Sequence, residues 1–310
     1  MVNVKLFSGT ASQYLAEKIA EYYGQPLGNI SILKFSDGEF QPNILESVRG
    51  SYVVFIQSTF APSDNLVELL MMMDAARRAS AGYITAVIPY FGFARQDRKD
   101  KPRVAIGSKL IANLLTAAGA NRIVTMDLHA SQIQGFFDIP VDHLDASAIF
   151  MPYLKKLNLS NITFASPDVG STNRARAYAQ YFNTEMVICD KHRKIANQIA
   201  SMTLIGNVEG KNVILVDDII DTASTLKNAA ALLIEKGALS VRALCTHPVL
   251  SGKAYETVEE SKLTEVLVCD TLPLKRESYK IKVLSVAQLF SKAIRNTYEH
   301  QSISSLFINP

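Results

Sequence analysis

The sequence predicts an α/β protein with two parallel sheets, and two observations lead to that prediction. Short runs rich in β-branched residues alternate with segments that carry apolar residues at helical spacing. The strand runs are NVKLF, YVVFIQ, YITAVI, RIVTM, NITFAS, MVIC, NVILV, VRALC and EVLVC. Alternation of this kind indicates parallel strands joined by helices. The strands outnumber those of one mid-sized sheet, which indicates two α/β halves.

The division between the halves is expected near residues 145–161. It gives an N-terminal α/β domain over 1–145 and a C-terminal α/β domain over 146–310, with a tail that can pack back on the first domain. A chain of 310 residues is long enough for two separate cores.

Composition excludes several classes of protein. With 48% hydrophobic and 20% charged residues the chain is expected to be globular, and a net charge of +3 is too small for a dedicated nucleic-acid binder. The longest uncharged run, 79–94, is shorter than the roughly 20 apolar residues of a membrane helix. The start MVNVKLFSGT lacks the apolar core of a secretory signal. We therefore expect a cytoplasmic protein without a membrane span.

The three cysteines, Cys189, Cys245 and Cys269, stand in separate short apolar runs. That placement indicates buried free thiols, in preference to disulfides or a metal cluster.

The stretch VILVDDIIDTASTL, residues 213–226, places Asp217, Asp218 and Asp221 before a turn of small and hydroxyl residues. The residues of that turn are Thr222, Ala223, Ser224 and Thr225. The pattern predicts a strand, a tight turn and a helix N-terminus, which is where ligands bind in open α/β sheets. Hydroxyls and free N–H groups suit a phosphate, and carboxylates suit a vicinal diol.

The alternative is that these residues only cap the helix. Three acids and three hydroxyls within nine residues exceed what capping requires. A sugar phosphate is therefore the ligand that this stretch predicts. The helix behind it, TLKNAAALLIEKG, places apolar residues on one face and Gly237 at its end.

The usual nucleotide-binding loops GxxxxGK[ST] and GxGxxG are absent from the sequence. GNVEGKN, residues 206–212, is one residue short of the first pattern and leads into a strand, so we interpret it as a turn.

Two basic segments follow predicted strands. RQDRKDKPR, residues 95–103, carries five basic residues against two acids, and DKHRK, residues 190–194, places Lys191 and Arg193 two positions apart in a predicted loop. Their place after strands favours a role in binding. The alternative is a solvated run of charges.

Taken together, these residues resemble the ribose-phosphate diphosphokinases, also called phosphoribosyl pyrophosphate synthetases. The resemblance extends nearly end to end and rests on KFSDGE, SVRG, QSTFAPSDNL, IPYFGFARQDRK, MDLHASQIQGFFDIPVDHL, SPDVG, CDKHRK and VDDIIDTASTL. It implies two domains of the phosphoribosyltransferase type, a homo-oligomer, commonly a hexamer, and transfer of the diphosphoryl group of ATP to the C1 hydroxyl of ribose 5-phosphate. The product would be phosphoribosyl diphosphate, made for nucleotide biosynthesis, with AMP.

The resemblance also implies roles for individual residues. Ribose 5-phosphate would be held by Asp217, Asp218 and the loop from Asp221 to Thr225. ATP would be held by Arg95 and Gln96 and, from a neighbouring subunit, by Phe35, Asp37, Gly38 and Glu39. Lys191 and Arg193 resemble the pair that stabilises the transferring group.

His129 and Asp168 resemble the Mg²⁺ site. Magnesium prefers oxygen ligands and retains water. We therefore expect His129 to contact the ion indirectly, or to contact ATP phosphate, in preference to binding the ion directly. Taken alone, that histidine would be interpreted as structural.

A phosphate-responsive regulatory site is also implied, formed by Ser47, Arg49, Ser80, Ser302 and Ser304. The alternative is an ordinary surface with serines near a basic residue.

The chain departs from the family pattern at Ser171 and Ser224, where glycine is usual. If either backbone requires a positive φ, serine would cost about 1 kcal/mol there, although Ser224 can return a hydroxyl to the phosphate.

Three other functions compete with this one. A phosphoribosyltransferase would share the acidic turn but would not need KFSDGE or the 95–103 segment. A regulatory, non-catalytic relative should have lost residues such as Lys191 and Arg193, which are present. A solute-binding protein would carry a secretion signal.

Overall fold

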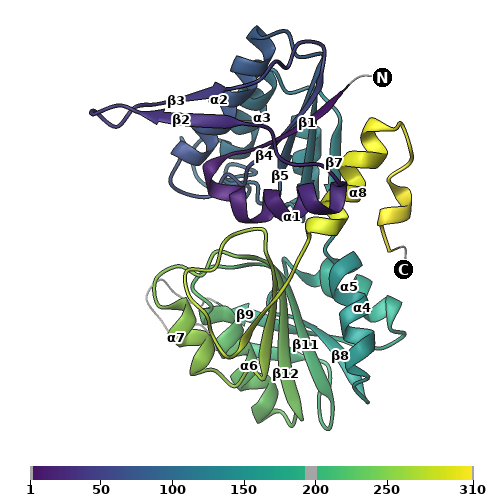
Figure 1. The fold of residues 1–310 in the computed structure, drawn as a ribbon. Helices are drawn as coiled ribbons and strands as arrows, with labels where there is room; N and C mark the ends of the chain where they lie inside the picture. The colour runs from purple at the N-terminus through teal and green to yellow at the C-terminus, as the bar shows by residue number, and fades with distance from the viewer. Residues whose placement is uncertain (1–2, 193–200, 309–310) are drawn as a thin grey trace. The chain divides into compact units, whose positions relative to one another are not determined.

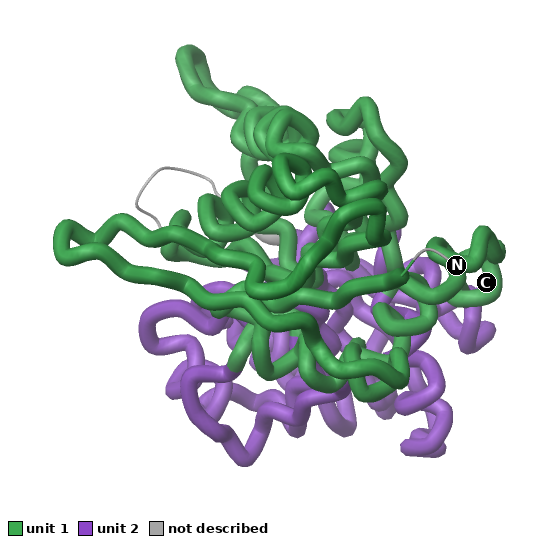
Figure 2. The backbone as a smooth tube through the Cα atoms, turned by 45° about the horizontal axis from the view of Figure 1, so that its top comes forward, with its two compact units in different colours: residues 1–145, 271–273, 286–307 green, residues 146–270, 274–285, 308–310 purple. Residues whose placement is uncertain are grey.

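The computed structural model describes residues 3–192 and 201–308, and the chain forms two compact units. Unit 1 consists of Met1–Asp145, Thr271–Pro273 and Val286–Phe307 (Figure 2). Unit 2 consists of Ala146–Asp270, Leu274–Ser285 and Ile308–Pro310. Two segments near the C-terminus, which follow most of unit 2 in the sequence, thus belong to unit 1.

Unit 1 contains, among its described residues, a five-stranded parallel sheet in the order β1-β4-β5-β6-β7 (Figure 1). Its strands are β1 (Val4–Ser8), β4 (Tyr52–Ile56), β5 (Tyr83–Ile88), β6 (Arg122–Met126) and β7 (Val141–Leu144). Side chains from Val53 to Ile56 are all buried, because helices cover both faces of such a sheet.

The helices of unit 1 pack around this sheet, and one of them, α8, comes from the C-terminal segment of the chain. They are α1 (Gln13–Tyr23), α2 (Asp64–Arg78), α3 (Gly107–Ala118) and α8 (Ala287–Tyr298), with short 3-10 turns at Thr10–Ser12, Ser131–Phe136 and Ser304–Leu306. Arg295 of α8 lies over the Tyr23 ring of α1, with its guanidinium carbon 4.6 Å from the ring centroid. The last long helix is therefore held against the first.

A two-stranded antiparallel hairpin, β2 (Ile30–Lys34) and β3 (Phe40–Ile44), projects from unit 1 (Figure 1). The sequence pattern did not predict it. β3 carries Pro42, which is unusual inside a strand and removes a backbone donor.

Unit 2 contains, in the described part of the chain, a seven-stranded sheet in the order β10-β9-β8-β11-β12-β13-β14. Its strands are β8 (Ile162–Ser166), β9 (Met186–His192), β10 (Ser201–Ile205), β11 (Asn212–Ile220), β12 (Ser240–Pro248), β13 (Glu265–Cys269) and β14 (Ile281–Leu284). All neighbours are parallel except β10, which pairs antiparallel with β9. Its helices are α4 (Ser147–Leu157), α5 (Thr172–Tyr181), α6 (Ser224–Glu235) and α7 (Ala254–Glu259).

Helix α6 follows the predicted pattern. Leu226, Ala229, Ala230 and Leu233 are buried in the core of unit 2, and Gly237 beyond the helix has a φ of +92°. That left-handed conformation suits glycine. The amphipathic face thus fixes the helix against the sheet, and its N-terminus lies directly after β11.

The predicted α/β class with two parallel sheets is confirmed. The GNVEGKN segment is a turn ahead of β11, as expected, with the Gly210 N–H donating to the Gly237 carbonyl at 2.9 Å. Cys189, Cys245 and Cys269 are free and buried.

Candidate functional site

The acidic turn of unit 2 is a tight connection between β11 and α6. Only Asp221, Thr222 and Ala223 separate the strand from the helix. Ala223 has a φ of +62°, in the left-handed region that is unfavourable for residues other than glycine. The turn therefore holds a strained residue at the start of α6, as turns at functional sites often do.

Neither serine that replaces a usual glycine has a left-handed backbone. Ser224 is the first residue of α6, and Ser171 has a φ of −89°. The cost of placing serine at a positive φ therefore does not arise at either position. The Ser224 hydroxyl instead lies 3.2 Å from that of Thr222, so the turn presents two adjacent hydroxyls beside the free N–H groups of a helix N-terminus.

A network of carboxylates lies at the carboxyl ends of β8 and β11. Asp217 Oδ1 accepts hydrogen bonds from the Ser171 hydroxyl at 2.8 Å and from the Asp218 N–H at 2.9 Å. Asp168 Oδ1 accepts one from the Ser171 N–H at 3.1 Å. Burial, reinforced by the Asp218 carboxylate, raises the pKa of Asp217 to about 7, while the Ser171 hydroxyl acts in the opposite direction.

The raised pKa means that the ionised form of Asp217 is destabilised in its surroundings. A partner that donates hydrogen bonds or carries positive charge would stabilise that ionised form. Asp218 beside it is also buried, with 6% of its surface exposed. Two carboxylates crowded in this way suit the vicinal hydroxyls of a sugar or a cation, which would offset their repulsion.

Sequence reasoning missed Ser251. Its hydroxyl donates to the Asp221 carboxylate, and its N–H donates to the Asp221 carbonyl at 3.0 Å. The Leu250 N–H donates to the carbonyl of Ile220 at 2.9 Å in the same connection. Ser251 and Gly252 form a small-residue pair in the connection that follows the predicted strand VRALC, and that signal could have identified this position.

Four of the residues predicted to hold ATP form the tip of the β2–β3 hairpin. The Phe35 N–H donates to the Glu39 carbonyl at 2.8 Å, and the Glu39 N–H donates to Asp37 Oδ1 at 3.0 Å. Gly38 has a φ of +97°, which explains glycine at this point of the turn. Phe35 is 46% exposed, so the tip presents an aromatic ring and two carboxylates to the surroundings.

Arg95 and Gln96 lie at the start of the basic segment of unit 1, and both are exposed. The Gln96 carbonyl accepts hydrogen bonds from the Ser108 N–H at 3.2 Å and the Ser108 hydroxyl at 2.9 Å. These two bonds anchor the beginning of the segment to the first turn of α3.

The prediction that residues 190–194 form a loop is wrong for its first part. Asp190 and Lys191 lie in β9, which continues to His192 because β10 pairs with it antiparallel. The pattern of apolar residues ended at Cys189, and it gave no sign of this polar hairpin. Arg193 lies outside the described residues.

His129 and Asp168 belong to different units. His129 is exposed in the connection after β6, and Asp168 is half-buried in the connection after β8. No group of three or more His, Cys, Asp or Glu side chains suited to a metal occurs within residues 3–192 and 201–308. The Asp168 carboxylate is an oxygen ligand of the kind that Mg²⁺ prefers, and this ion retains several waters and needs few protein ligands.

The residues predicted to form a regulatory site lie at two places in unit 1. Ser47 and Arg49 are exposed in the β3–β4 connection, and the Gly50 N–H donates to the Ser80 carbonyl at 2.8 Å, which links Ser80 to that connection. In the C-terminal segment, the hydroxyls of Ser302 and Ser304 lie 2.7 Å apart.

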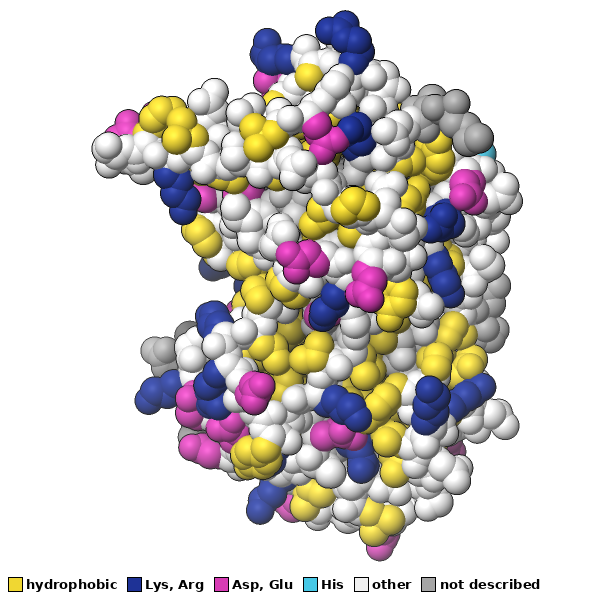
Figure 3. All heavy atoms as spheres, in the orientation of Figure 1, with side chains coloured by type: hydrophobic (Ala, Val, Ile, Leu, Met, Phe, Trp, Pro, Cys, Tyr) yellow, Lys and Arg dark blue, Asp and Glu magenta, His cyan; other side chains and the backbone are white. Residues whose placement is uncertain are grey.

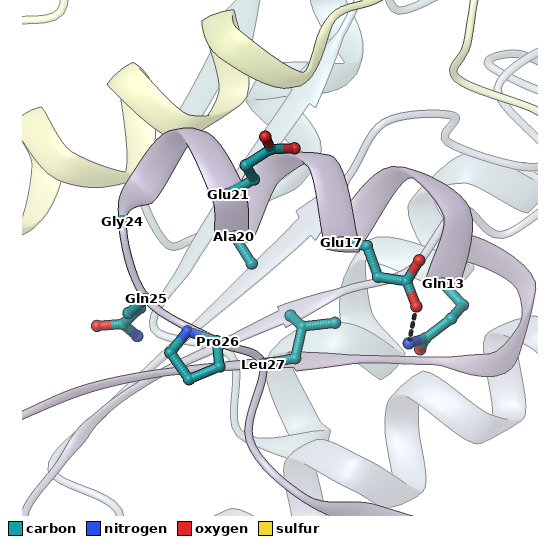
Figure 4. A pocket seen from close by; sticks show the side chains of 8 residues that line it. All are labelled: Gln13, Glu17, Ala20, Glu21, Gly24, Gln25, Pro26 and Leu27. Carbon is teal, nitrogen blue, oxygen red and sulfur yellow. Dashed lines mark hydrogen bonds between the residues drawn. The ribbon is translucent and has the colours of Figure 1, made fainter.

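A pocket lies along α1 and the segment that follows it, at residues 13–27 (Figure 4). Its lining includes Gln13, Glu17, Glu21 and Leu27, and the Gln13 amide donates to Glu17 Oε1 at 2.8 Å. It contains none of the predicted site residues. We therefore locate the candidate site at the strand ends and not in this pocket.

The face of the molecule drawn in Figure 3 carries Lys and Arg side chains interspersed with Asp and Glu. This agrees with the small net charge of +3. Among the helices of the described residues, none is long and apolar enough to cross a membrane.

Comparison with protein families identifies both parts of the chain. A family model described as the N-terminal domain of ribose phosphate pyrophosphokinase matches residues 4–119. A second, described as the phosphoribosyl synthetase-associated domain, matches residues 171–308.

Individual relatives match over nearly their whole length. The ribose-phosphate pyrophosphokinase of Porphyromonas gingivalis is 56% identical, with 98% of each chain covered. That of Wolinella succinogenes is 55% identical, covering 99% of this chain and 100% of the relative. The crystal structure of phosphoribosylpyrophosphate synthetase from Mycobacterium smegmatis is similar with a TM-score of 0.92 at 38% identity, covering 96% of this chain and 99% of that one.

Proposed function

This chain belongs to the ribose-phosphate pyrophosphokinase family of transferases, and from that premise we propose that it transfers the diphosphoryl group of ATP to the C1 hydroxyl of ribose 5-phosphate. The C1 oxygen forms a bond to the β-phosphorus, and the bond from that phosphorus to the oxygen of the α-phosphate breaks. The hydroxyl proton is released to solvent, and the products are 5-phosphoribosyl 1-diphosphate and AMP.

The acidic turn is the observation that carries this proposal. Thr222, Ser224 and Thr225, with the free N–H groups at the start of α6, hold the 5-phosphate. Asp217 and Asp218 accept hydrogen bonds from the ribose hydroxyls. Asp221, held by Ser251, keeps the turn in the shape that presents both groups.

ATP binds to Arg95 and Gln96 and to the hairpin tip of a neighbouring subunit, where Phe35 offers a ring for stacking on the base. Lys191 and Arg193 stabilise the charge on the transferring group. Phosphoryl-type transfer depends on in-line positioning and charge stabilisation more than on covalent participation of the protein. A nucleophilic serine or cysteine is therefore unnecessary.

Mg²⁺ is the cofactor that fits these groups. Asp168 would hold it, with His129 in contact through water or through ATP phosphate. When bound, the ion supplies positive charge to the phosphate oxygens.

Self-association, as a homohexamer, would complete the ATP site. The hairpin supports this proposal, because Leu33 and Phe35 are 55% and 46% exposed on a two-stranded ribbon, and such a ribbon is only marginally stable alone. We also propose a cytoplasmic location and a phosphate-responsive role for Ser47, Arg49, Ser80, Ser302 and Ser304.

Product analysis tests the function. Incubation with ATP, Mg²⁺ and ribose 5-phosphate should yield AMP in an amount equal to the sugar consumed, and omission of the sugar should abolish AMP formation. Accumulation of ADP, or AMP formed at the same rate without the sugar, would refute the proposal.

A further inference from the structure

We propose that Ser171 is a positioning residue for the sugar substrate: it fixes the orientation of the Asp217 carboxylate and links it to Asp168. The proposal rests on the proposed function, because it concerns how the same site holds ribose 5-phosphate. Ser171 stands where the family resemblance leads us to expect glycine, so its hydroxyl is an addition made by this chain.

The contacts of Ser171 join two carboxylates through one residue. Its hydroxyl donates to Asp217 Oδ1 at 2.8 Å, and its N–H donates to Asp168 Oδ1 at 3.1 Å. Ser171 is itself 8% exposed. A serine held in this way cannot turn to solvent without losing a part-buried hydrogen bond to a carboxylate.

Helix capping does not account for this hydroxyl. Ser171 is the N-cap residue of α5, where a serine side chain ordinarily accepts a hydrogen bond from an N–H of the first turn. In the part of the chain that the structure describes, α5 has no side-chain hydrogen bond at its N-cap. The hydroxyl is directed to Asp217 instead, so its contribution belongs to the carboxylate and not to the helix.

Removal of the hydroxyl should loosen the carboxylate that accepts the sugar hydroxyls. Among the described residues, Asp217 would then keep the N–H and the side chain of Asp218, both of which come from its own strand. A hydrogen bond to a charged acceptor is stronger than one between neutral groups. The effect of removing the hydroxyl should be confined to the sugar, because the hydroxyl binds Asp217, whereas the bond to Asp168 is made by the Ser171 N–H, which every variant keeps.

The test is calorimetric titration of the full-length protein with ribose 5-phosphate in the absence of ATP, at an alkaline pH where Asp217 is ionised. Ser171→Ala should weaken binding by about tenfold, the loss expected for a hydrogen bond to a carboxylate. Thr172→Ala is the matched control, because the Thr172 hydroxyl lies in the same turn but donates to the Val169 carbonyl at 2.9 Å. Its affinity should stay within about twofold of the wild type.

Two further variants separate positioning from a structural role. Ser171→Thr, which keeps the hydroxyl, should restore most of the affinity, and Ser171→Gly should lose it as Ser171→Ala does. In an Asp217→Asn background, the effect of Ser171→Ala should fall to about twofold, because a neutral amide accepts a weaker hydrogen bond. The KM for ATP should not change in any Ser171 variant.

Three results would overturn the inference. Wild-type affinity in both Ser171→Ala and Ser171→Gly would remove the hydroxyl from the site. An undiminished tenfold loss in the Asp217→Asn background would show that Ser171 does not act through Asp217. In either case wild-type binding of ribose 5-phosphate leaves the proposed function intact. A wild-type protein that forms no AMP from ATP and ribose 5-phosphate would refute both the inference and the proposed function.

Discussion

The two units are built on similar parallel sheets, yet the connections after their strands differ in length and charge. In unit 2, three residues join β11 to α6, and carboxylates dominate the strand end. In unit 1, the connection from β5 to α3 spans residues 89–106 and contains the basic segment. A short rigid turn suits a small sugar phosphate. A long cationic connection suits the larger and more highly charged ATP. Under the proposed function, one type of sheet would therefore support two different binding tasks.

Lys191→Ala should produce the largest effect, which is a loss of turnover. It sharpens the comparison of the two units because Lys191 is a cation in unit 2, where carboxylates dominate the strand end. Loss of one preorganised charge partner typically lowers turnover by ~10² to 10³. Affinities for ATP and for the sugar should change little if Lys191 acts mainly in the transition state. Quench-flow measurement of AMP formation, with equilibrium titration of the same sample, checks both points.

Lys211→Ala is the control for that variant. Lys211 is also in unit 2, and its amine lies 3.3 Å from the exposed carboxylate of Glu185, so turnover should be unaffected. Near-normal turnover of Lys191→Ala would remove Lys191 from the mechanism.

Asp221→Asn should weaken ribose 5-phosphate binding by about 10- to 100-fold, because it removes a charge that the turn holds through Ser251. ATP binding should be unchanged. Titration calorimetry with each ligand measures the two affinities. Glu260→Gln serves as the control because, within the described residues, that exposed carboxylate pairs with Lys227 at the surface. Loss of ATP affinity alone would break the assignment of the acidic turn to the sugar.

The pH dependence of sugar binding should follow Asp217. Burial and the neighbouring Asp218 raise its pKa from 3.8 to about 7, so the carboxylate that accepts the sugar hydroxyls forms only as the pH rises through that value. Affinity should therefore increase from slightly acid to slightly alkaline pH and then level off. The Asp217→Asn variant should retain only the titration of the ligand phosphate, and an unchanged pH profile in that variant would contradict this reasoning.

The same raised pKa makes the stability of the fold change with pH in the opposite direction to sugar affinity. Because the folded protein holds the Asp217 proton more tightly than the unfolded chain does, this residue favours folding most at low pH, and its contribution declines as the pH rises from about 4 to about 7. Added ribose 5-phosphate should offset the decline, which thermal unfolding at several pH values can measure.

Ser251→Ala should have the smallest effect, about three- to tenfold in sugar affinity. The Ser251 N–H would still hold the Asp221 carbonyl at 3.0 Å, so the turn keeps part of its support. Thr257→Ala, which removes a hydroxyl that donates to the Lys253 carbonyl, is the control in calorimetric titration. An effect equal to that of Asp221→Asn would mean that the hydroxyl, and not the main chain, holds the turn.

Local sequence predicted the elements whose own residues determine them. The β-branched runs became buried strands, and the apolar face of α6 was predicted together with its terminal glycine. The sequence did not predict β3, which contains Pro42, or the extension of β9 through Lys191, because those strands depend on a partner and not on apolar alternation.

The candidate site likewise has a part that local sequence predicts and a part that depends on the order of the strands. The acidic turn is contiguous, so its residues could be identified from one stretch of sequence. The bonds from Ser171 to Asp217 and from Ser251 to Asp221 depend on the strand order β8-β11-β12, which brings separate connections together. No local pattern specifies that order.

The most direct measurement follows the fate of ATP labelled in its β-phosphate during reaction with ribose 5-phosphate and Mg²⁺. Diphosphoryl transfer predicts that all of the label appears in the sugar product and that the AMP is unlabelled. Label retained in ADP would indicate transfer of the γ-phosphate alone, and label in free pyrophosphate would indicate hydrolysis. Either of those results would contradict the account.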